Sequence, residues 1–260
     1  MSRRLELVLR VALPILSVVV LFAFWSIYVH TATVSAFVLP APEKIGRAFL
    51  VQIADRAVWR HAGVTVTETL SGFVAALASG VLLGTLLAKI PPLEWALKPF
   101  VIVLQLVPKV ALAPLFVLWF GFGLESKIVI SGVLAFFPVF ANTLVAMKSI
   151  DPGDREVFAS LRAGPLATFR LLEWPAALPF VLTGAEVAIV LAIIGAIVGE
   201  FIGGNAGLGY LAVAKLQDLQ VDALFAVILV LTLLGLLMYG AVALLRRWLV
   251  PWHQASAAAG

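Results

Sequence analysis

The chain has 260 residues, of which 63% are hydrophobic and 12% are charged, and its formal net charge is +4. Soluble domains carry about twice that share of charged residues, because they must cover themselves with a hydrated surface. The mean hydropathy of +1.11 therefore excludes a soluble globular protein and indicates one that lipid solvates. The basic residues are dispersed at the ends of apolar runs, which does not indicate a nucleic-acid partner. The absence of cysteine excludes disulfides and thiolate metal sites.

Crossing a bilayer takes about 20 predominantly apolar residues in a helix. Six segments of the chain meet this requirement, so the sequence predicts an all-α polytopic membrane protein with spans near 7–29, 62–88, 95–120, 128–147, 175–202 and 223–249. The first segment is longer than the apolar core of a signal peptide, which has about 7–15 residues. We therefore expect a retained span, although Val-Ser-Ala at 34–36 resembles a cleavage site.

An even number of spans places both termini on one side of the membrane. The predicted loops on that side carry more basic residues than the opposite loops do. Since cytoplasmic loops are enriched in lysine and arginine, we expect both termini in the cytoplasm. The basic residues on this side are Arg3, Arg4, Arg10, Lys89, Lys98, Lys148, Arg155, Arg162, Arg170, Arg246 and Arg247.

The chain is expected to divide into an N-terminal region (1–61), a core of five spans (62–250) and a disordered tail of small residues (251–260). The N-terminal region holds the first span and an outer segment that begins with an extended Pro-Ala-Pro at 40–42. Apolar residues then recur at near-helical spacing, at Ile45, Ala48, Phe49, Ile53 and Val58. This pattern predicts a short amphipathic helix on the membrane surface, which serves either as a connector or as a partner-binding element.

A polar segment at 149–174 separates the fourth and fifth spans. It opens with Asp-Pro-Gly-Asp at 151–154, a turn in which Asp154 can cap a helix over 155–163. Gly-Pro at 164–165 then breaks the chain before a second helical piece over 166–174, which leads into Pro175 at the first turn of the fifth span.

The first of these two helices is expected to expose Val157, Phe158 and Leu161 on one face. A helix–break–helix hairpin with an apolar ridge on the cytoplasmic side is what a docking element for a soluble partner requires. An ordinary cytoplasmic loop is also compatible with these residues.

This segment resembles the EAA loop of importer permeases in the ATP-binding cassette superfamily. Glu156 matches the acidic first residue of that loop, and Pro-Ala-Ala-Leu-Pro at 175–179 resembles its closing element. Two departures are present: Val157-Phe158 replaces a pair of alanines, and Arg162 stands where the family usually has glycine, with Gly164 two residues later. The resemblance implies an ATPase-coupling site formed by Glu156, Val157, Phe158, Ala159, Leu161, Arg162 and Gly164.

Further motifs are similar to the nitrate, sulfonate and taurine branch of these permeases. They are Leu-Pro-Ala-Pro at 39–42, Pro-Lys-Val-Ala-Leu-Ala-Pro-Leu at 108–115, Trp-Phe-Gly-Phe-Gly at 119–123, Phe-Phe-Pro at 136–138, Gly-Glu-Phe-Ile-Gly at 199–203 and Gly-Leu-Gly-Tyr at 207–210. The resemblance implies a type I importer permease fold in a bacterial inner membrane and a homodimer that lines one path for a small, anionic solute. It also implies two copies of a separate ATP-hydrolysing subunit and an external binding protein, while this chain binds no cofactor or metal and has no catalytic residue.

Charged and polar side chains at membrane depth are costly and are candidates for function. Lys109 either attracts an anionic substrate, or pairs with Glu68, Glu186 or Glu200, or extends to the interface. Glu186 is expected in an ion pair or a dimer contact, and Glu200, with glycines after it, at an outer gate or in a simple turn. Gln105 and Asn142 line the path or bond across helices. The candidate path residues are Gln105, Lys109, Phe137, Asn142, Glu186 and Glu200.

Two other classes of protein, an intramembrane enzyme and a stand-alone carrier or channel, are alternatives to an importer subunit. An intramembrane enzyme is disfavoured, because His30, His61 and His253 are far apart in sequence and no HExxH or GxSxG motif is present. A stand-alone ion-coupled carrier or channel fits the spans and the buried charges, but it does not require an apolar ridge on a cytoplasmic loop.

Overall fold

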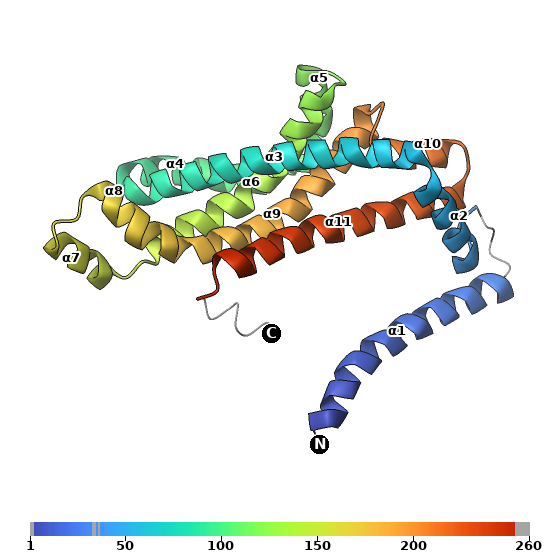
Figure 1. The fold of residues 1–260 in the computed structure, drawn as a ribbon. Coiled ribbons are helices and arrows are strands. Elements are labelled where there is room, and N and C mark those ends of the chain that lie inside the picture. Colours follow the sequence, from blue (N-terminus) through green and yellow to red (C-terminus); the bar gives the residue numbers. More distant parts are fainter. Residues whose placement is uncertain (1–2, 33–34, 36, 253–260) are drawn as a thin grey trace. The chain divides into compact units, whose positions relative to one another are not determined.

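The structure is a computed structural model that describes residues 3–32, 35 and 37–252, with side chains described from Ala12 onward. The predicted tail at 253–260, with His253, and most of the cleavage-like site at 34–36 lie outside the described residues. Every regular element within the described part is a helix (Figure 1). Contacts divide the chain into two units, Met1–Trp59 with Leu211–Leu231, and Arg60–Tyr210 with Thr232–Gly260.

The first unit contains α1 (Arg3–Thr31), α2 (Pro42–Ala54), most of α10 (Leu208–Gln217) and the start of α11 (Val221–Leu249). The Ser26 hydroxyl of α1 donates to Glu43 Oε1 of α2 at 2.8 Å. The amphipathic helix expected after Pro42 is confirmed, with Ile45 buried on its inner side. It ends at Ala54, because Asp55 adopts an extended conformation. The Asp55 side chain accepts the N–H of Ala57 in the first turn of the next helix, α3 (Arg56–Lys89). Val58 therefore belongs to the next helix.

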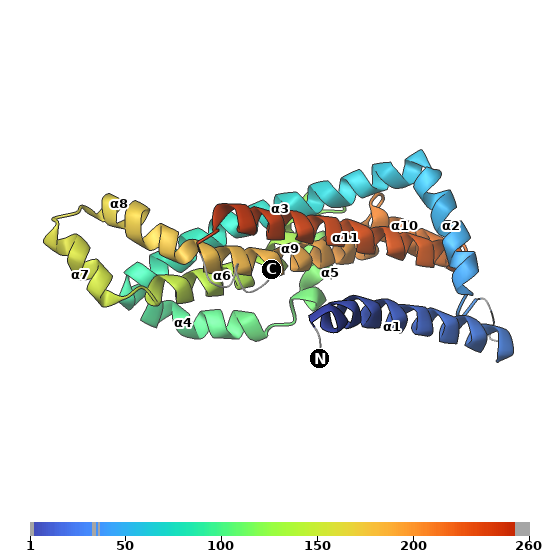
Figure 2. The same cartoon turned by 60° about the horizontal axis from the view of Figure 1, so that its bottom comes forward.

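In the second unit, α6 (Leu124–Lys148) and α9 (Trp174–Gly203) lie side by side along most of their length (Figure 2). Glycine permits this close packing: a Cβ at Gly195 of α9 would lie 2.6 Å from the Cα of Ser131 in α6. α3 also packs closely against α6, where a Cβ at Gly80 would lie 2.9 Å from Val139. The small-residue faces predicted for the second span, at Gly72, Gly80 and Gly84, are confirmed as contacts that admit no larger side chain.

Five of the described helical segments are long and apolar enough to cross a membrane, and a sixth span is present if a bent pair counts as one. The bent pair is the predicted third span: α4 (Pro91–Leu106) meets a 3₁₀ turn, η1 (Lys109–Leu112), and α5 (Ala113–Phe120) at 83°. Pro108 causes the bend, because it has no N–H to donate to α4 and holds Val107 in an extended conformation. Figure 1 shows α5 turned away from the direction of α4.

Candidate functional site

The 149–174 segment begins with a capped helix. The helix, α7 (Pro152–Ser160), follows Asp151, whose side chain accepts the N–H of Gly153 at 2.7 Å. The predicted cap, Asp154, is therefore wrong: it lies in the first helical turn. Asp151 has the advantage that proline follows it, and proline at the first helical position fixes φ without losing a needed donor.

The C-terminal end of α7 explains the unusual residue at 162. Arg162 has φ +51°, and its N–H bonds to the carbonyl of Ala159 at 2.9 Å, while the N–H of Ala163 bonds to that of Phe158 at 3.0 Å. These two bonds, together with the left-handed conformation of Arg162, form a Schellman cap. Glycine is favoured at this left-handed position because it has no Cβ. Arg162 thus occupies the glycine position in geometry as well as in sequence, and α7 ends at Ser160 rather than at Ala163.

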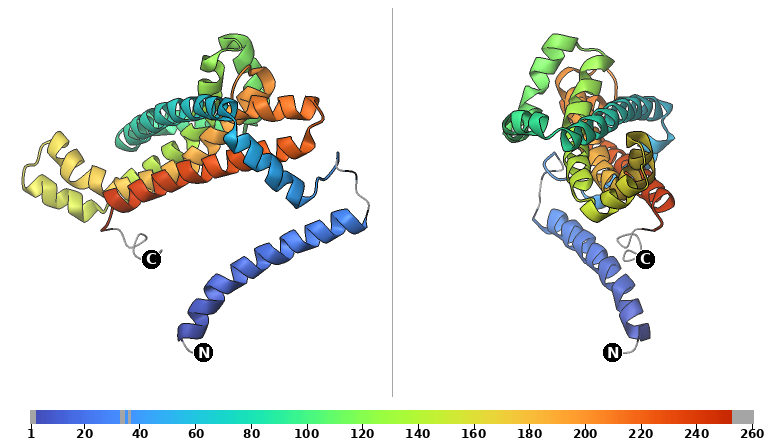
Figure 3. Two further views of the ribbon diagram at one scale, coloured as in Figure 1. Left: turned by 45° about the vertical axis from the view of Figure 1, so that its right-hand side comes forward. Right: turned by 90° about the vertical axis from the view of Figure 1, so that its left-hand side faces the viewer.

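The second half of the segment leads into the fifth span without interruption. After an extended Gly164, α8 (Pro165–Thr168) continues through a π-helical turn, η2 (Phe169–Glu173), into α9. The predicted helix–break–helix plan is confirmed, and α7 and α8 form a hairpin beyond the ends of α6 and α9 (Figure 1, Figure 3). Single π-helical turns within α-helices are frequent at functional sites.

The expected apolar ridge is only partly present. Val157 is 57% exposed and Leu161 is 73% exposed, but Phe158 is half-buried, so the prediction of an exposed Phe158 is wrong. Leu166 and Leu171, in the second half of the segment, are also largely exposed. The sequence did not mark these two leucines, because a short interrupted helix has too few turns for its faces to be read from spacing.

A buried carboxylate, Glu173, anchors the hairpin. Its side chain is 6% exposed and forms ion pairs with Lys89 Nζ, at 2.6 Å, and with Arg155 Nη2, at 3.6 Å. Lys89 ends α3, Arg155 lies in α7 and Glu173 leads into α9, so one carboxylate ties three elements together. The Arg155 guanidinium also donates to the carbonyl of Met147 at 3.0 Å. Sequence reasoning missed this group, whose only signal was a lone acid just before a span.

At the bend of the third span, three candidate path residues come together. Lys109 Nζ donates to the backbone carbonyl of Gln105 at 3.0 Å and lies 4.4 Å from the ring centre of Phe137. The lysine thus occupies the carbonyl end of α4, where a cation is favourable, and faces an aromatic ring. Within the described residues, its ammonium group forms no ion pair with any of the glutamates suggested as partners. Gln105 also lines a cavity of about 180 Å³ between α4 and α6.

Two further candidates form contacts inside the helical core. Asn142 Nδ2 donates to the carbonyl of Pro138 at 2.8 Å in the same helix, so the expected bond across helices is not the one it makes. Glu186 is buried, and its Oε1 lies 3.0 Å from Nε of Arg246 near the end of α11. The guanidinium of Arg246 also reaches Thr183 Oγ1 at 3.3 Å. The expected ion pair of Glu186 is confirmed within one copy of the chain.

Glu200 holds the loop that follows α9. Its side chain, 1% exposed, accepts the Thr65 hydroxyl at 2.6 Å and the N–H of Gly209 at 2.5 Å. The Thr65 hydroxyl in turn accepts the N–H of Leu208 at 2.8 Å. A Cβ at Gly207, which has φ +105°, would lie 2.1 Å from Glu200 Oε1. The glycines after Glu200 are therefore a consequence of folding the loop back onto this carboxylate.

The same region contains buried groups that sequence reasoning did not select. Lys127 is 2% exposed and donates to the carbonyls of Phe122, at 2.5 Å, and Gly203, at 2.8 Å. Glu68 is 2% exposed and lies near Glu200. Nδ1 of His61 accepts the N–H of Gly207 at 3.0 Å. All lie far from Glu200 in sequence, and each alone reads as an ordinary polar residue near a span end.

Comparison with known proteins agrees with this arrangement. Residues 80–251 match the family model described as "Binding-protein-dependent transport system inner membrane component". The riboflavin transport system permease protein of Chloroflexus aurantiacus is 36% identical over 93% of this chain and 90% of its own length. The formylaminopyrimidine transport permease protein of Halalkalibacterium halodurans is 33% identical over 93% of this chain and 96% of its own length. The taurine transport system permease protein of Escherichia coli is 28% identical over 97% of this chain and 95% of its own length.

Among solved structures, the inward-facing MetNI methionine ABC transporter matches with a TM-score of 0.60 at 23% identity, over 75% of this chain and 94% of that one, which shows the fold. The family model and relatives above 30% identity cover most of the chain. The chain therefore belongs to the binding-protein-dependent transport system inner membrane component family, the permease subunits of ATP-binding cassette importers.

Proposed function

We propose that the chain lines the solute path of its importer and that the hairpin at 151–175 is the surface on which a separate ATPase subunit docks. The observation that carries this proposal is the contrast between the two sides of α7. Its inner side is tied to Glu173 through Arg155, whereas Val157 and Leu161 are exposed in a segment outside the candidate spans. Large apolar side chains on a rigid, water-facing helix favour a protein partner.

The Glu173 anchor also gives a route for coupling. ATP binding by two partner subunits brings their docking sites together, and a hairpin bonded to α3 and α9 moves those helices with it. The path then opens outward. In this proposal the chain binds no cofactor and performs no catalysis, since the partner hydrolyses ATP. Two copies of the chain form a homodimer in a bacterial inner membrane, with both termini in the cytoplasm and an external binding protein on the other face.

The transported solute is proposed to be a small anion of the sulfonate, taurine or nitrate type. Relatives named for taurine and for aliphatic sulfonates cover most of this chain. A heteroaromatic solute is the second candidate, favoured by the Phe137 ring at the bend and by relatives named for riboflavin and formylaminopyrimidine. Calorimetric titration of the importer's cognate external binding protein, with taurine and with riboflavin, separates the two candidates.

Co-purification tests the docking proposal. Tagged permease carrying Leu161→Glu or Val157→Glu should be inserted normally in mild detergent but should no longer retain the ATPase that the wild-type chain retains. The matched control is Leu219→Glu, because Leu219 is similarly exposed, at 66% against 73% for Leu161, but lies in the turn between α10 and α11. Retention of the ATPase by the α7 variants, or equal loss with Leu219→Glu, would contradict the proposal.

A further inference from the structure

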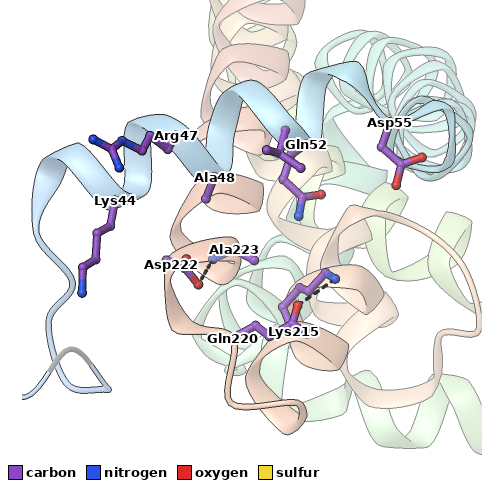
Figure 4. A pocket seen from close by; sticks show the side chains of 10 residues that line it. Lys44, Arg47, Ala48, Gln52, Asp55, Lys215, Gln220, Asp222 and Ala223 are labelled. Carbon is purple, nitrogen blue, oxygen red and sulfur yellow. Dashed lines mark hydrogen bonds between the residues drawn. The ribbon is translucent and has the colours of Figure 1, made fainter.

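A charged groove lies between α2 and the turn that joins α10 to α11, within the unit formed by Met1–Trp59 and Leu211–Leu231 (Figure 4). Its volume is about 600 Å³. The charged and amide side chains that line it come from both walls: Lys44, Arg47, Gln52, Asp55, Lys215, Gln220 and Asp222.

The acidic side chains of the groove are held by hydrogen bonds, whereas the two basic side chains of α2 form no salt bridge in the part of the chain that the structure describes. Both carboxylates accept backbone N–H groups at helix starts, Asp55 that of Ala57 at 2.8 Å and Asp222 that of Ala223 at 2.9 Å. Lys44 and Arg47, in contrast, are exposed and form no salt bridge with a described residue, although the pKa of Glu43 is lowered first by a backbone hydrogen bond and further by the nearby Arg47. The lining therefore presents two basic side chains along α2 that no salt bridge in the described structure holds in place.

The groove continues into an apolar end. A smaller cavity of about 180 Å³ shares Lys44 and Asp222 with it and is also lined by Phe37 and Leu219. These two side chains are 69% and 66% exposed, and both lie outside the candidate spans. Leu219 has φ +58°, which places it at the tip of a tight turn. Charged side chains beside exposed apolar ones match the polar rim and apolar centre of a protein interface.

Chain order places the groove on the membrane face opposite the 151–175 hairpin. Asp55 is the residue before α3, which is one of the spanning helices. The last residue of α3 is Lys89, which bonds to Glu173 of the hairpin. If the hairpin faces the cytoplasm, as the proposed function requires, the groove faces outward.

We propose that this groove is the surface on which the external binding protein docks, and that the docking lobe presents carboxylates to Lys44 and Arg47 beside an apolar side chain for Phe37 and Leu219. The inference rests on the proposed function. A mixed lining favours a protein over a phosphate or a lipid headgroup, because the two aspartates repel a purely anionic ligand. A protein surface can offer both signs of charge, and such complementarity sets the rate and specificity of docking.

The test measures the affinity of the importer's cognate external binding protein for the complete transporter in nanodiscs. The Lys44→Glu/Arg47→Glu variant should bind at least about tenfold more weakly, because like charges then face each other. The control is Arg56→Glu/Arg60→Glu, which changes the charge equally at exposed residues of the first turns of α3 that do not line the groove. The affinity of the control should stay close to that of wild type. Wild-type affinity should also fall as NaCl rises, and less so for Lys44→Gln/Arg47→Gln.

The outcomes separate this inference from the proposed function. Equal affinity of the groove variant and the control would overturn the docking surface, and retention of the ATPase in the same preparation would leave the proposed function standing. Absence of the ATPase from wild-type preparations would overturn the proposed function itself. A loss of affinity that occurs only in nanodiscs containing phosphatidylglycerol, and not in pure phosphatidylcholine, would assign the groove to lipid headgroups and overturn the inference.

Discussion

Replacing Gly207 by alanine tests whether Glu200 holds the loop after α9. Gly207 has φ +105°, and a side chain there would meet the Glu200 carboxylate at 2.1 Å. An alanine at a left-handed position costs about 1–2 kcal/mol. The carboxylate is at the end of a side chain, but it is 1% exposed and fixed by Thr65 and Gly209, so it moves only by losing one of those bonds.

A hydrogen bond to a charged group contributes about 1.5–3 kcal/mol. Gly207→Ala should therefore lower the free energy of unfolding by about 2.5–5 kcal/mol, the sum of the two effects. The measurement is equilibrium unfolding in mixed dodecylmaltoside and SDS micelles, followed by tryptophan fluorescence.

Two other glycines separate the contributions. Gly121 has φ +81° and ψ −179°, a backbone region essentially restricted to glycine, with nothing within 4 Å of a built Cβ, so Gly121→Ala should show only the backbone cost of about 1–3 kcal/mol. Gly46 lies inside α2 with free space and an ordinary φ, so Gly46→Ala should stabilise by about 0.5–1 kcal/mol. If Gly207→Ala costs no more than Gly121→Ala, the carboxylate does not hold the loop and the reasoning fails.

Three further predictions concern other contacts. Arg162→Gly should raise the free energy of unfolding by about 0.5 kcal/mol, since relief of the left-handed conformation slightly exceeds the added freedom of the unfolded chain, and no gain in the same micelle assay would contradict the Schellman cap. Glu186→Gln should cost about 2–3 kcal/mol, less than for a fully buried pair because the Arg246 side chain is 21% exposed, and a double-mutant cycle with Arg246→Gln should reveal the coupling. A backbone N–H and then the Ser26 hydroxyl hold the pKa of Glu43 below its ordinary value. The stabilising α1–α2 contact is therefore fully present at pH values above the ordinary pKa of glutamate and is lost as pH falls through the lower pKa of the folded state. Ser26→Ala should raise the Glu43 pKa, as NMR titration can measure.

The features that local sequence encodes were predicted correctly. A span is defined by consecutive apolar residues, and its ends by prolines and charges within a few positions, so the helix beginning at Trp174 and the amphipathic helix after Pro42 could be placed to within a few residues. The loop between α6 and α9 was predicted for the same reason, since its break depends on neighbouring Gly164 and Pro165. Its docking role stays a prediction.

The errors arose where several local solutions compete. Asp151 and Asp154 are both plausible caps, and only the backbone decides that the first accepts the N–H of Gly153. The direction of Lys109 was also open, because Pro108 predicts a break but not the angle at which the next helix leaves. The observed bend of 83° brings the lysine to Phe137 instead of to a glutamate.

The sequence by itself determined that this protein is a bundle of lipid-solvated helices with one hairpin suited to a partner, because hydropathy and helix breaks act over a few residues. Tertiary structure alone decided which polar groups meet. Thr65 and Glu200 are 135 positions apart, and no periodicity in either helix predicts their 2.6 Å contact. A buried charge accepts whichever partner the packing brings within reach, and that packing depends on close glycine contacts between α3, α6 and α9.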